Sequence, residues 1–231
     1  MFVKNNGLRP LNTVQYVFFH IFVLHTVQPS LFKMTKKAAR TTAFIIQTVA
    51  PIFNRHGYIG TSMSDLTQAT GLTKGAIYGN FENKESLALS AFEHNRNRLL
   101  ESLDNRLEHG DTSLDKLMDL LSFYKQYDLF TLPLGGCPIL NVGVDAQGNN
   151  KILAAAVRET IRDIEGKIAL VLENGAKKNE IQLSIPPLQF AKQLFTMIQG
   201  AIAMSTMTHD RKYLINTLTY LEQLIRRELK V

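Results

Sequence analysis

The sequence predicts an all-α protein, and three features of the 231-residue chain support that class. No stretch shows the sustained two-residue alternation of apolar and polar side chains that is typical of a half-buried strand. Apolar residues instead recur at helical spacing, as in Leu99, Leu103 and Leu107. Prolines beyond residue 85 are confined to a few breaks between these patterns. The expected organisation is an extension over 1–33 and two helical domains, over 34–85 and 86–231.

Composition and motifs exclude several classes of protein. The chain carries 26 Lys and Arg residues against 20 Asp and Glu, which gives a formal net charge of +6. A single cysteine cannot close an intrachain disulfide, so a disulfide-built secreted scaffold is excluded and a cytoplasmic location is expected. The chain has no His-Glu-x-x-His, Cys-x-x-Cys, phosphate-loop or Gly-x-Ser-x-Gly motif, and its six histidines form no cluster. We therefore expect no enzyme, no cofactor and no metal.

The basic excess lies at the N-terminal end of the chain. Residues 1–33 hold three cations and no acid, and residues 34–85 hold six cations against three acids. Residues 86–231 hold 17 groups of each sign and are electrically neutral. This asymmetry indicates a domain that faces nucleic acid, carried on a neutral body.

Residues 1–33 differ in character from the rest. The run 14–24 is apolar apart from Gln15 and His20, but it is shorter than the roughly 20 residues that a membrane-spanning helix needs. A second methionine, Met34, stands directly before a helical pattern. We expect an extension that is disordered or results from a misassigned translation start. A membrane-associating segment and a helix packed on the body remain alternatives.

The first helix of the basic domain is expected to begin near Thr35 and to end at Gly57. Pro51 should kink it, because proline cannot donate a backbone bond to Gln47. Cations in its first turns are unfavourable beside the positive end of the helix, and an external anion would relieve them. Its apolar face is Ile46, Val49, Ala50 and Phe53, and its cations are Lys36, Lys37 and Arg40.

Two short helices follow, joined by a turn that contains a glycine. Ser62 can cap the first of them, Gly71 ends it, and Thr73 can cap the next, expected over 74–81. Such a pair forms a helix-turn-helix, whose second helix enters a major groove of DNA. The small residues 75–76 would let the backbone approach DNA closely.

Residues 35–87 resemble the N-terminal domain of the TetR family of transcriptional regulators. The specific signal is the register Gly-x-x-Lys-Gly-x-x-Tyr-x-x-Phe-x-x-Lys-x-x-Leu, which runs from Gly71 to Leu87. Gly79 and Asn80 stand where many members have a bulkier aromatic and histidine pair. The resemblance and the exposed cations together imply these DNA contacts: Lys36, Arg40, Thr61, Ser62, Thr73, Lys74, Gly75, Ala76, Tyr78, Asn80 and Lys84.

The body is expected to be helical throughout. Its helices are expected over 84–109, after Ser113, from Pro138 to near Gly148, over 151–177, after Pro187 and after Asp210, with a loop or short turn over 128–136. The resemblance implies that the last two helices form a four-helix bundle with a twofold partner, although their apolar stripe could equally be intrachain core. The implied dimer interface is Leu194, Ile198, Ala201, Ile202, Ser205, Leu214, Leu218, Leu221 and Ile225.

The middle helices would enclose a ligand pocket. Few charged residues fall on their expected inner faces, which favours a hydrophobic or amphipathic effector. Cys137, in a Gly-Cys-Pro element that resembles one in some ligand domains of the family, could be a sensor. A buried small side chain is favoured instead, because no cation lies near it in sequence. The expected lining is Phe92, Leu99, Phe123, Tyr127, Phe130, Cys137, Ile139 and Phe195, each of which could also be simple core.

The sequence thus predicts a homodimeric, ligand-responsive regulator of transcription. As a repressor it would bind a palindromic double-stranded DNA operator, with half-sites about 34 Å or a multiple apart, and a small-molecule effector would release it. Two alternatives stay open. One is an activator of the same family, and the other is a membrane-associated protein that uses residues 14–24.

Overall fold

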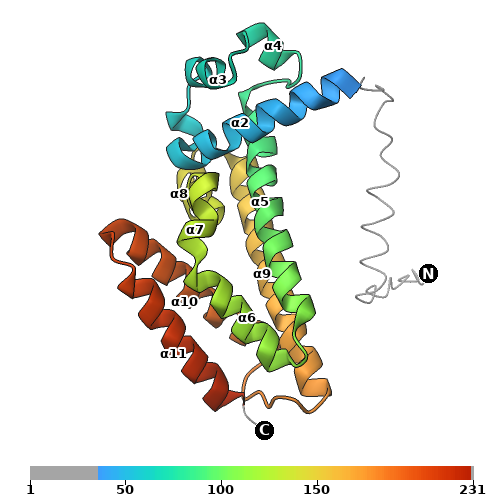
Figure 1. Ribbon diagram of the computed structural model, residues 1–231, viewed down its shortest axis with the longest axis vertical. Coiled ribbons are helices and arrows are strands. Elements are labelled where there is room, and N and C mark those ends of the chain that lie inside the picture. The colour runs from blue at the N-terminus through green and yellow to red at the C-terminus, as the bar shows by residue number, and fades with distance from the viewer. Residues whose placement is uncertain (1–35, 230–231) are drawn as a thin grey trace, which may run out of the picture. The chain divides into compact units, whose positions relative to one another are not determined.

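The computed structural model describes residues 36–229, with every side chain in that range except that of Lys36. The expected extension 1–33, and with it the membrane alternative, lies outside the described residues. Within them each regular element is helical and none is a strand, as predicted (Figure 1). In chain order the elements are α2 (Lys36–Gly60), α3 (Met63–Thr70), α4 (Lys74–Tyr78), α5 (Lys84–His109), α6 (Ser113–Lys125), α7 (Tyr127–Thr131), the 3-10 turn η1 (Leu132–Leu134), α8 (Pro138–Ala146), α9 (Lys151–Lys177), α10 (Pro187–Thr208) and α11 (Lys212–Glu228).

Local capping explains where the short helices begin and end. Ser62 caps α3 in a reciprocal capping box with Asp65, and Gly71 ends α3 in the left-handed conformation at φ 67°. Thr73 caps α4 by accepting a hydrogen bond from the Ala76 backbone N–H. The expected third helix over 74–81 is too long, because a turn begins after Tyr78.

Gly57 ends the regular part of α2, as predicted. Its backbone, at φ 74° and ψ 173°, interrupts the helical geometry, and a short further turn continues to Gly60. Pro51 lies inside α2. Val49, Ala50 and Phe53 of the expected apolar face are buried, but Ile46 is only half-buried and Ile45 is buried in its place.

The described residues from 40 onward form one compact unit, and its core extends from Ile45 in α2 to Leu229 after α11. In the body, α5 packs along α9, and α10 pairs with α11 (Figure 1). Since α5 begins at Lys84, directly after the helix-turn-helix, one helix runs from the DNA-binding domain into the body. Among residues 36–229 no single helix could cross a membrane, and only the bent pair 127–134 and 138–146, at 55° to each other, has the necessary length and composition.

The segment expected as a loop over 128–136 is partly helical. It consists of α7 and η1, and only residues 135–136 are irregular before α8. Tyr127 packs at 5.6 Å from Phe123 between ring centres, and the Thr131 hydroxyl donates to the Tyr127 carbonyl at 2.8 Å. These contacts, each between residues four positions apart, stabilise a turn of helix where the sequence pattern indicated a loop.

Candidate functional site

The exposed surface of α4 consists of residues that the sequence assigns to DNA. Ile77 is the buried residue of this helix, and its burial turns the other side chains outward. Lys74 Nζ lies 5.8 Å from the centre of the Tyr78 ring, and Tyr78 is 37% exposed. Gly75 and Ala76 are exposed and add almost no side chain. The backbone and the Lys74 ammonium are therefore accessible at the start of this helix, and the Tyr78 phenol is accessible at its end.

Two further residues of the predicted set are exposed helix caps. Thr73 Oγ1 accepts from the Ala76 backbone N–H at 3.2 Å. Ser62 Oγ donates to Asp65 Oδ2 at 2.8 Å, and the Ser62 backbone N–H donates to the same oxygen at 2.7 Å. These hydrogen bonds, that from the backbone first, hold the pKa of Asp65 below its ordinary value. Both caps mark helix starts whose first backbone N–H groups lack intrahelical partners.

Two predicted DNA contacts are used inside the protein instead. Thr61 is only 1% exposed, and its hydroxyl donates to the Gly57 carbonyl at 2.7 Å. The Asn80 amide accepts from the Thr42 hydroxyl at 2.8 Å and donates to the Ala76 carbonyl at 2.9 Å. The expectation that the Thr61 side chain contacts phosphate is wrong, and Asn80 is a link between α2 and the end of α4. The partner Thr42 lies 38 positions from Asn80, so sequence reasoning could not identify that link, whereas the Thr61 partner, Gly57, is only four positions away.

Lys84 is also held by the protein. Its ammonium donates to the Tyr58 carbonyl at 2.6 Å and lies 4.5 Å from the centre of the Tyr58 ring. Partial burial lowers the pKa of Lys84, against the opposing attraction of Asp145 and Asp65. Lys84 therefore positions Tyr58 as well as contributing positive charge. The Tyr58 backbone N–H also donates to Asp145, a contact that the sequence did not identify because the two residues are 87 positions apart.

The basic start of α2 is described in part. Lys37 and Arg40 are exposed, whereas the side chain of Lys36 lies outside the described residues. Exposed cations on a helix add salt-dependent affinity for a phosphate backbone without specifying a base sequence. The exposed position of Arg40 is therefore compatible with the predicted contact between this residue and DNA.

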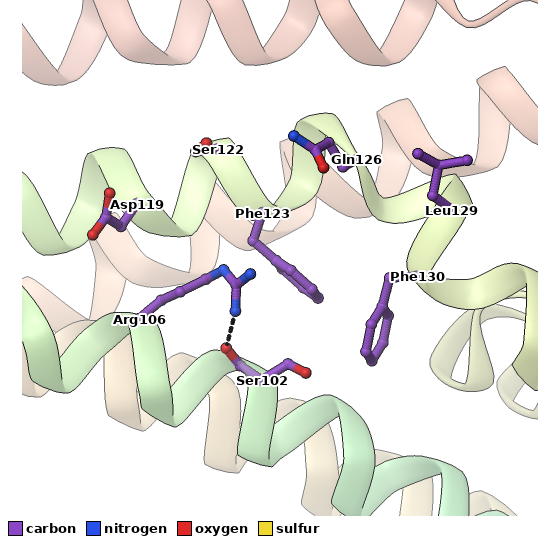
Figure 2. A pocket seen from close by; sticks show the side chains of 8 residues that line it. All are labelled: Ser102, Arg106, Asp119, Ser122, Phe123, Gln126, Leu129 and Phe130. Carbon is purple, nitrogen blue, oxygen red and sulfur yellow. Dashed lines mark hydrogen bonds between the residues drawn. The ribbon is translucent and has the colours of Figure 1, made fainter.

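Three cavities of the size of a small-molecule site open into the body. The first, here called the α5–α7 cavity, has about 610 Å³ and lies between α5, α6 and α7, and Figure 2 shows its lining: Ser102, Arg106, Asp119, Ser122, Phe123, Gln126, Leu129 and Phe130. The second, of about 550 Å³, includes Tyr127 and Cys137. The third, of about 630 Å³, lies between α5, α6 and α9 and includes the ion pair of Lys167 and Asp104. Of the expected pocket residues, Phe92 lines a small space between α2, α5, α8 and α9. The others, Leu99, Ile139 and Phe195, line none of these four spaces and are core.

Comparison with known proteins resolves the class of this fold. Residues 45–91 match the family model described as bacterial regulatory proteins, tetR family. Residues 113–221 match the model described as tetracyclin repressor-like, C-terminal domain. The chain belongs to the TetR family of transcriptional regulators. It is accordingly a DNA-binding regulator and not an enzyme.

Solved structures and curated proteins of the TetR family are similar to this chain along most of their own length. A TetR-family transcriptional regulator from Cytophaga hutchinsonii is 34% identical, with 85% of this chain and 98% of that chain covered at a TM-score of 0.79. One from Chloroflexus aurantiacus J-10-FL is 29% identical, with 85% and 100% covered at a TM-score of 0.80. The HTH-type transcriptional repressor DhaR of Mycobacterium sp. (strain GP1) is 23% identical over 175 residues, 76% of this chain and 87% of that protein.

The predicted dimer residues of this TetR-family chain lie inside one subunit. Leu218, Leu221 and Ile225 have no exposed surface, and Ser205 alone of the set is more than marginally accessible. The expectation that the other residues form the interface is wrong, because the apolar stripe faces the core of its own chain: Leu194, Ile198, Ala201, Ile202, Leu214, Leu218, Leu221 and Ile225. The exposed large apolar residues of α10 and α11, here called the α10–α11 outer face, are Leu188, Met204, Met207, Tyr213 and Tyr220.

Cys137 is a buried helix cap in this structure. Its Sγ accepts from the Tyr127 hydroxyl at 3.2 Å and from the Leu140 backbone N–H at 3.4 Å. Burial raises the pKa of the Cys137 thiol, although these hydrogen bonds oppose the shift. A protonated, buried thiol is a poor nucleophile, so the geometry favours a packing and capping role over a sensor.

Proposed function

We propose that this protein is a homodimeric repressor that binds a palindromic operator and releases it when a small-molecule effector occupies the body. The observation that carries the proposal is the exposed start of α4. There residues 73–76 expose their backbone and the Lys74 ammonium, and the Tyr78 ring lies beside Lys74. In a helix-turn-helix this end of the second helix is the part that reaches base edges and phosphates. A repressor acting on DNA fits a cytoplasmic protein.

Dimerisation is supported by the α10–α11 outer face. Its Met207 is 70% exposed and its Tyr220 is 49% exposed. Large apolar side chains gathered on two neighbouring helices are typical of a protein–protein interface. A twofold pair of helix-turn-helix domains requires two half-sites in the DNA, so the operator is palindromic. The sign of regulation follows the DhaR relative, which is named a repressor.

Effector response is supported by continuity between the cavities and the DNA-binding domain. Ser102 and Arg106 line the α5–α7 cavity from α5, whose first residue is Lys84. A ligand that binds two arrangements of α5 with different affinity shifts the population between them. Such a shift changes the distance between the two recognition helices of a dimer and therefore the operator affinity.

Selection of bound sequences from random double-stranded DNA tests the proposal. We expect a palindromic consensus, and we expect Lys74→Ala to lose affinity for it about tenfold or more. Tyr78→Phe should lose less, because it removes only the hydroxyl. Lys177→Ala is the matched control, since this exposed cation lies at the far end of α9, and it should bind like the native chain. Selection without a consensus, or equal losses in Lys74→Ala and Lys177→Ala, would overturn the proposal.

A further inference from the structure

The α5–α7 cavity contains a cation without a carboxylate partner. Arg106 is half-buried and lines the cavity from α5. Its guanidinium donates to the Ser102 carbonyl at 2.8 Å. The ion pairs found among residues 36–229 do not include it. Most of its N–H donors therefore remain available to an oxygen acceptor inside the cavity.

An aromatic wall lies beside this cation. The Arg106 Cζ atom lies 4.5 Å from the centre of the Phe123 ring, and Phe130 packs edge-on against Phe123 at 5.0 Å between centres. Figure 2 shows the guanidinium and both rings directed into the space between α5, α6 and α7. Stacking on Phe123 holds the guanidinium in place before any ligand arrives, which reduces the cost of ordering it on binding.

The remaining lining limits the charge of a ligand. Asp119 is the one acidic residue of this lining, and it is exposed. A carboxylate at the cavity repels a second or third negative group on the ligand. Ser122 and Gln126 add uncharged polar groups at the exposed side. The cavity thus combines one available cation, one aromatic wall and one acid.

The second cavity lacks this combination. Its acid, Asp128, already pairs with Arg211 at 3.1 Å. Its thiol, Cys137, accepts from the Tyr127 hydroxyl at 3.2 Å. Its cation, Arg55, is exposed and is not among the cation–ring contacts found in residues 36–229, so this cavity makes a weaker case for a charged ligand with an aromatic body.

We propose that the α5–α7 cavity binds an amphipathic anion with one negative group, which Arg106 holds, and an apolar or aromatic body against Phe123 and Phe130. The inference rests on the proposed effector response and specifies the chemical class of the effector. Charge-assisted hydrogen bonds from a planar guanidinium suit a carboxylate or sulfonate. A neutral ligand of the same shape would leave Arg106 unpaired and would bind more weakly.

Fluorescence titration of the full chain without DNA tests the proposal with two probes of one shape. The anion is 1-anilinonaphthalene-8-sulfonate, and its neutral counterpart is N-phenyl-1-naphthylamine. Arg106→Gln should weaken sulfonate binding about tenfold or more, and it should change binding of the neutral probe less than about twofold. Arg98→Gln is the matched control, because Arg98 is an exposed cation of the same helix that does not line the cavity. It should bind both probes like the native chain.

Two more variants separate charge from packing. Arg106→Lys keeps the charge and should retain most of the sulfonate affinity, and Asp119→Asn should raise it about two- to fivefold by removing the repulsion. Two outcomes would overturn the inference. One is that Arg106→Gln binds the sulfonate as tightly as the native chain does, and the other is that Arg106→Gln loses the same factor of affinity for the sulfonate and for the neutral probe. Operator affinity is measured separately with and without saturating sulfonate. Arg106-dependent binding that leaves operator affinity unchanged would support the anion site while contradicting the effector response of the proposed function.

Discussion

The Asp145 carboxylate in α8 accepts a hydrogen bond from the Tyr58 backbone N–H at 2.6 Å, which connects the body to the end of α2. The Tyr58 carbonyl in turn accepts from Lys84 at 2.6 Å. Tyr58 is therefore held from α8 on one side and from the start of α5 on the other. Gly57 makes this arrangement possible, because a Cβ atom on it would collide with the Asp145 carboxylate.

Gly57→Ala should destabilise the protein by about 1–3 kcal/mol. Alanine is strained at φ 74°, and its methyl group would displace Asp145. Urea unfolding measures the change. Gly60→Ala is the control, since a Cβ there meets only His56 Cβ at 3.8 Å, and it should change stability little. Equal losses in the two variants would contradict the account of Gly57.

Asp145→Ala should lower the free energy of unfolding by about 1–3 kcal/mol, because the Tyr58 N–H loses a charged acceptor. Asp145→Asn should lose less, since its amide oxygen can still accept. In the double variant with Gly57→Ala, the combined loss should be smaller than the sum, because the collision is removed along with the carboxylate. Strict additivity in urea unfolding would show that the two residues do not interact.

Asn80→Ala should weaken operator binding without changing its salt dependence. The amide links Thr42 to the end of α4, so its removal loosens the recognition helix but removes no phosphate contact. Lys74→Ala should lower the slope of log affinity against log salt by about one. Titrations at several salt concentrations distinguish the two. Operator affinity that stays unchanged in Asn80→Ala would contradict the role of this link.

Tyr220→Glu, which places a charge on the α10–α11 outer face, should convert dimers into folded monomers. Burying an unpaired charge at an interface is costly, whereas the isolated subunit can leave it in water. Sedimentation velocity and circular dichroism measure mass and fold. Leu170→Glu is the control on α9, since Leu170 is 55% exposed and should tolerate the charge. A Tyr220→Glu variant that stays dimeric would exclude this face as the interface.

The Cys137 thiol should react slowly with iodoacetamide in the native protein up to pH 9. Its folded pKa is raised above the ordinary value of 9.0, so ionisation favours the unfolded chain. The stability that the buried thiol contributes is complete below the unfolded pKa, and it declines as pH rises through the folded one. Urea unfolding from pH 7 to pH 10 should therefore show a decrease that Cys137→Ala lacks. Fast native alkylation at pH 8 would contradict this environment.

Sequence reasoning was accurate where local chemistry determines structure. The capped starts at Ser62, Thr73 and Pro138 were all predicted, because hydroxyl caps and proline act within one turn of a helix. The bounds of α5 and α9 were predicted from caps and apolar spacing.

Several of the predictions that failed, and the contacts that were missed, involve residues that are far apart in the sequence. The apolar spacing of Leu218 and Leu221 shows that one face of α11 is buried, but it does not tell whether the same chain or a second copy covers it. Arg106 gave no signal in the sequence as a cavity residue, because its neighbour Phe123 comes from another helix. The contact between Asp145 and Tyr58 was invisible for the same reason.

The central claim is tested most directly by the mass of the protein–DNA complex on its selected operator. Sedimentation of a labelled palindromic duplex should show two chains bound together, with no intermediate that holds one chain. The same duplex with one half-site scrambled should lose most of the affinity. Tight binding of a single chain, or equal affinity for the intact and the scrambled duplex, would contradict the account.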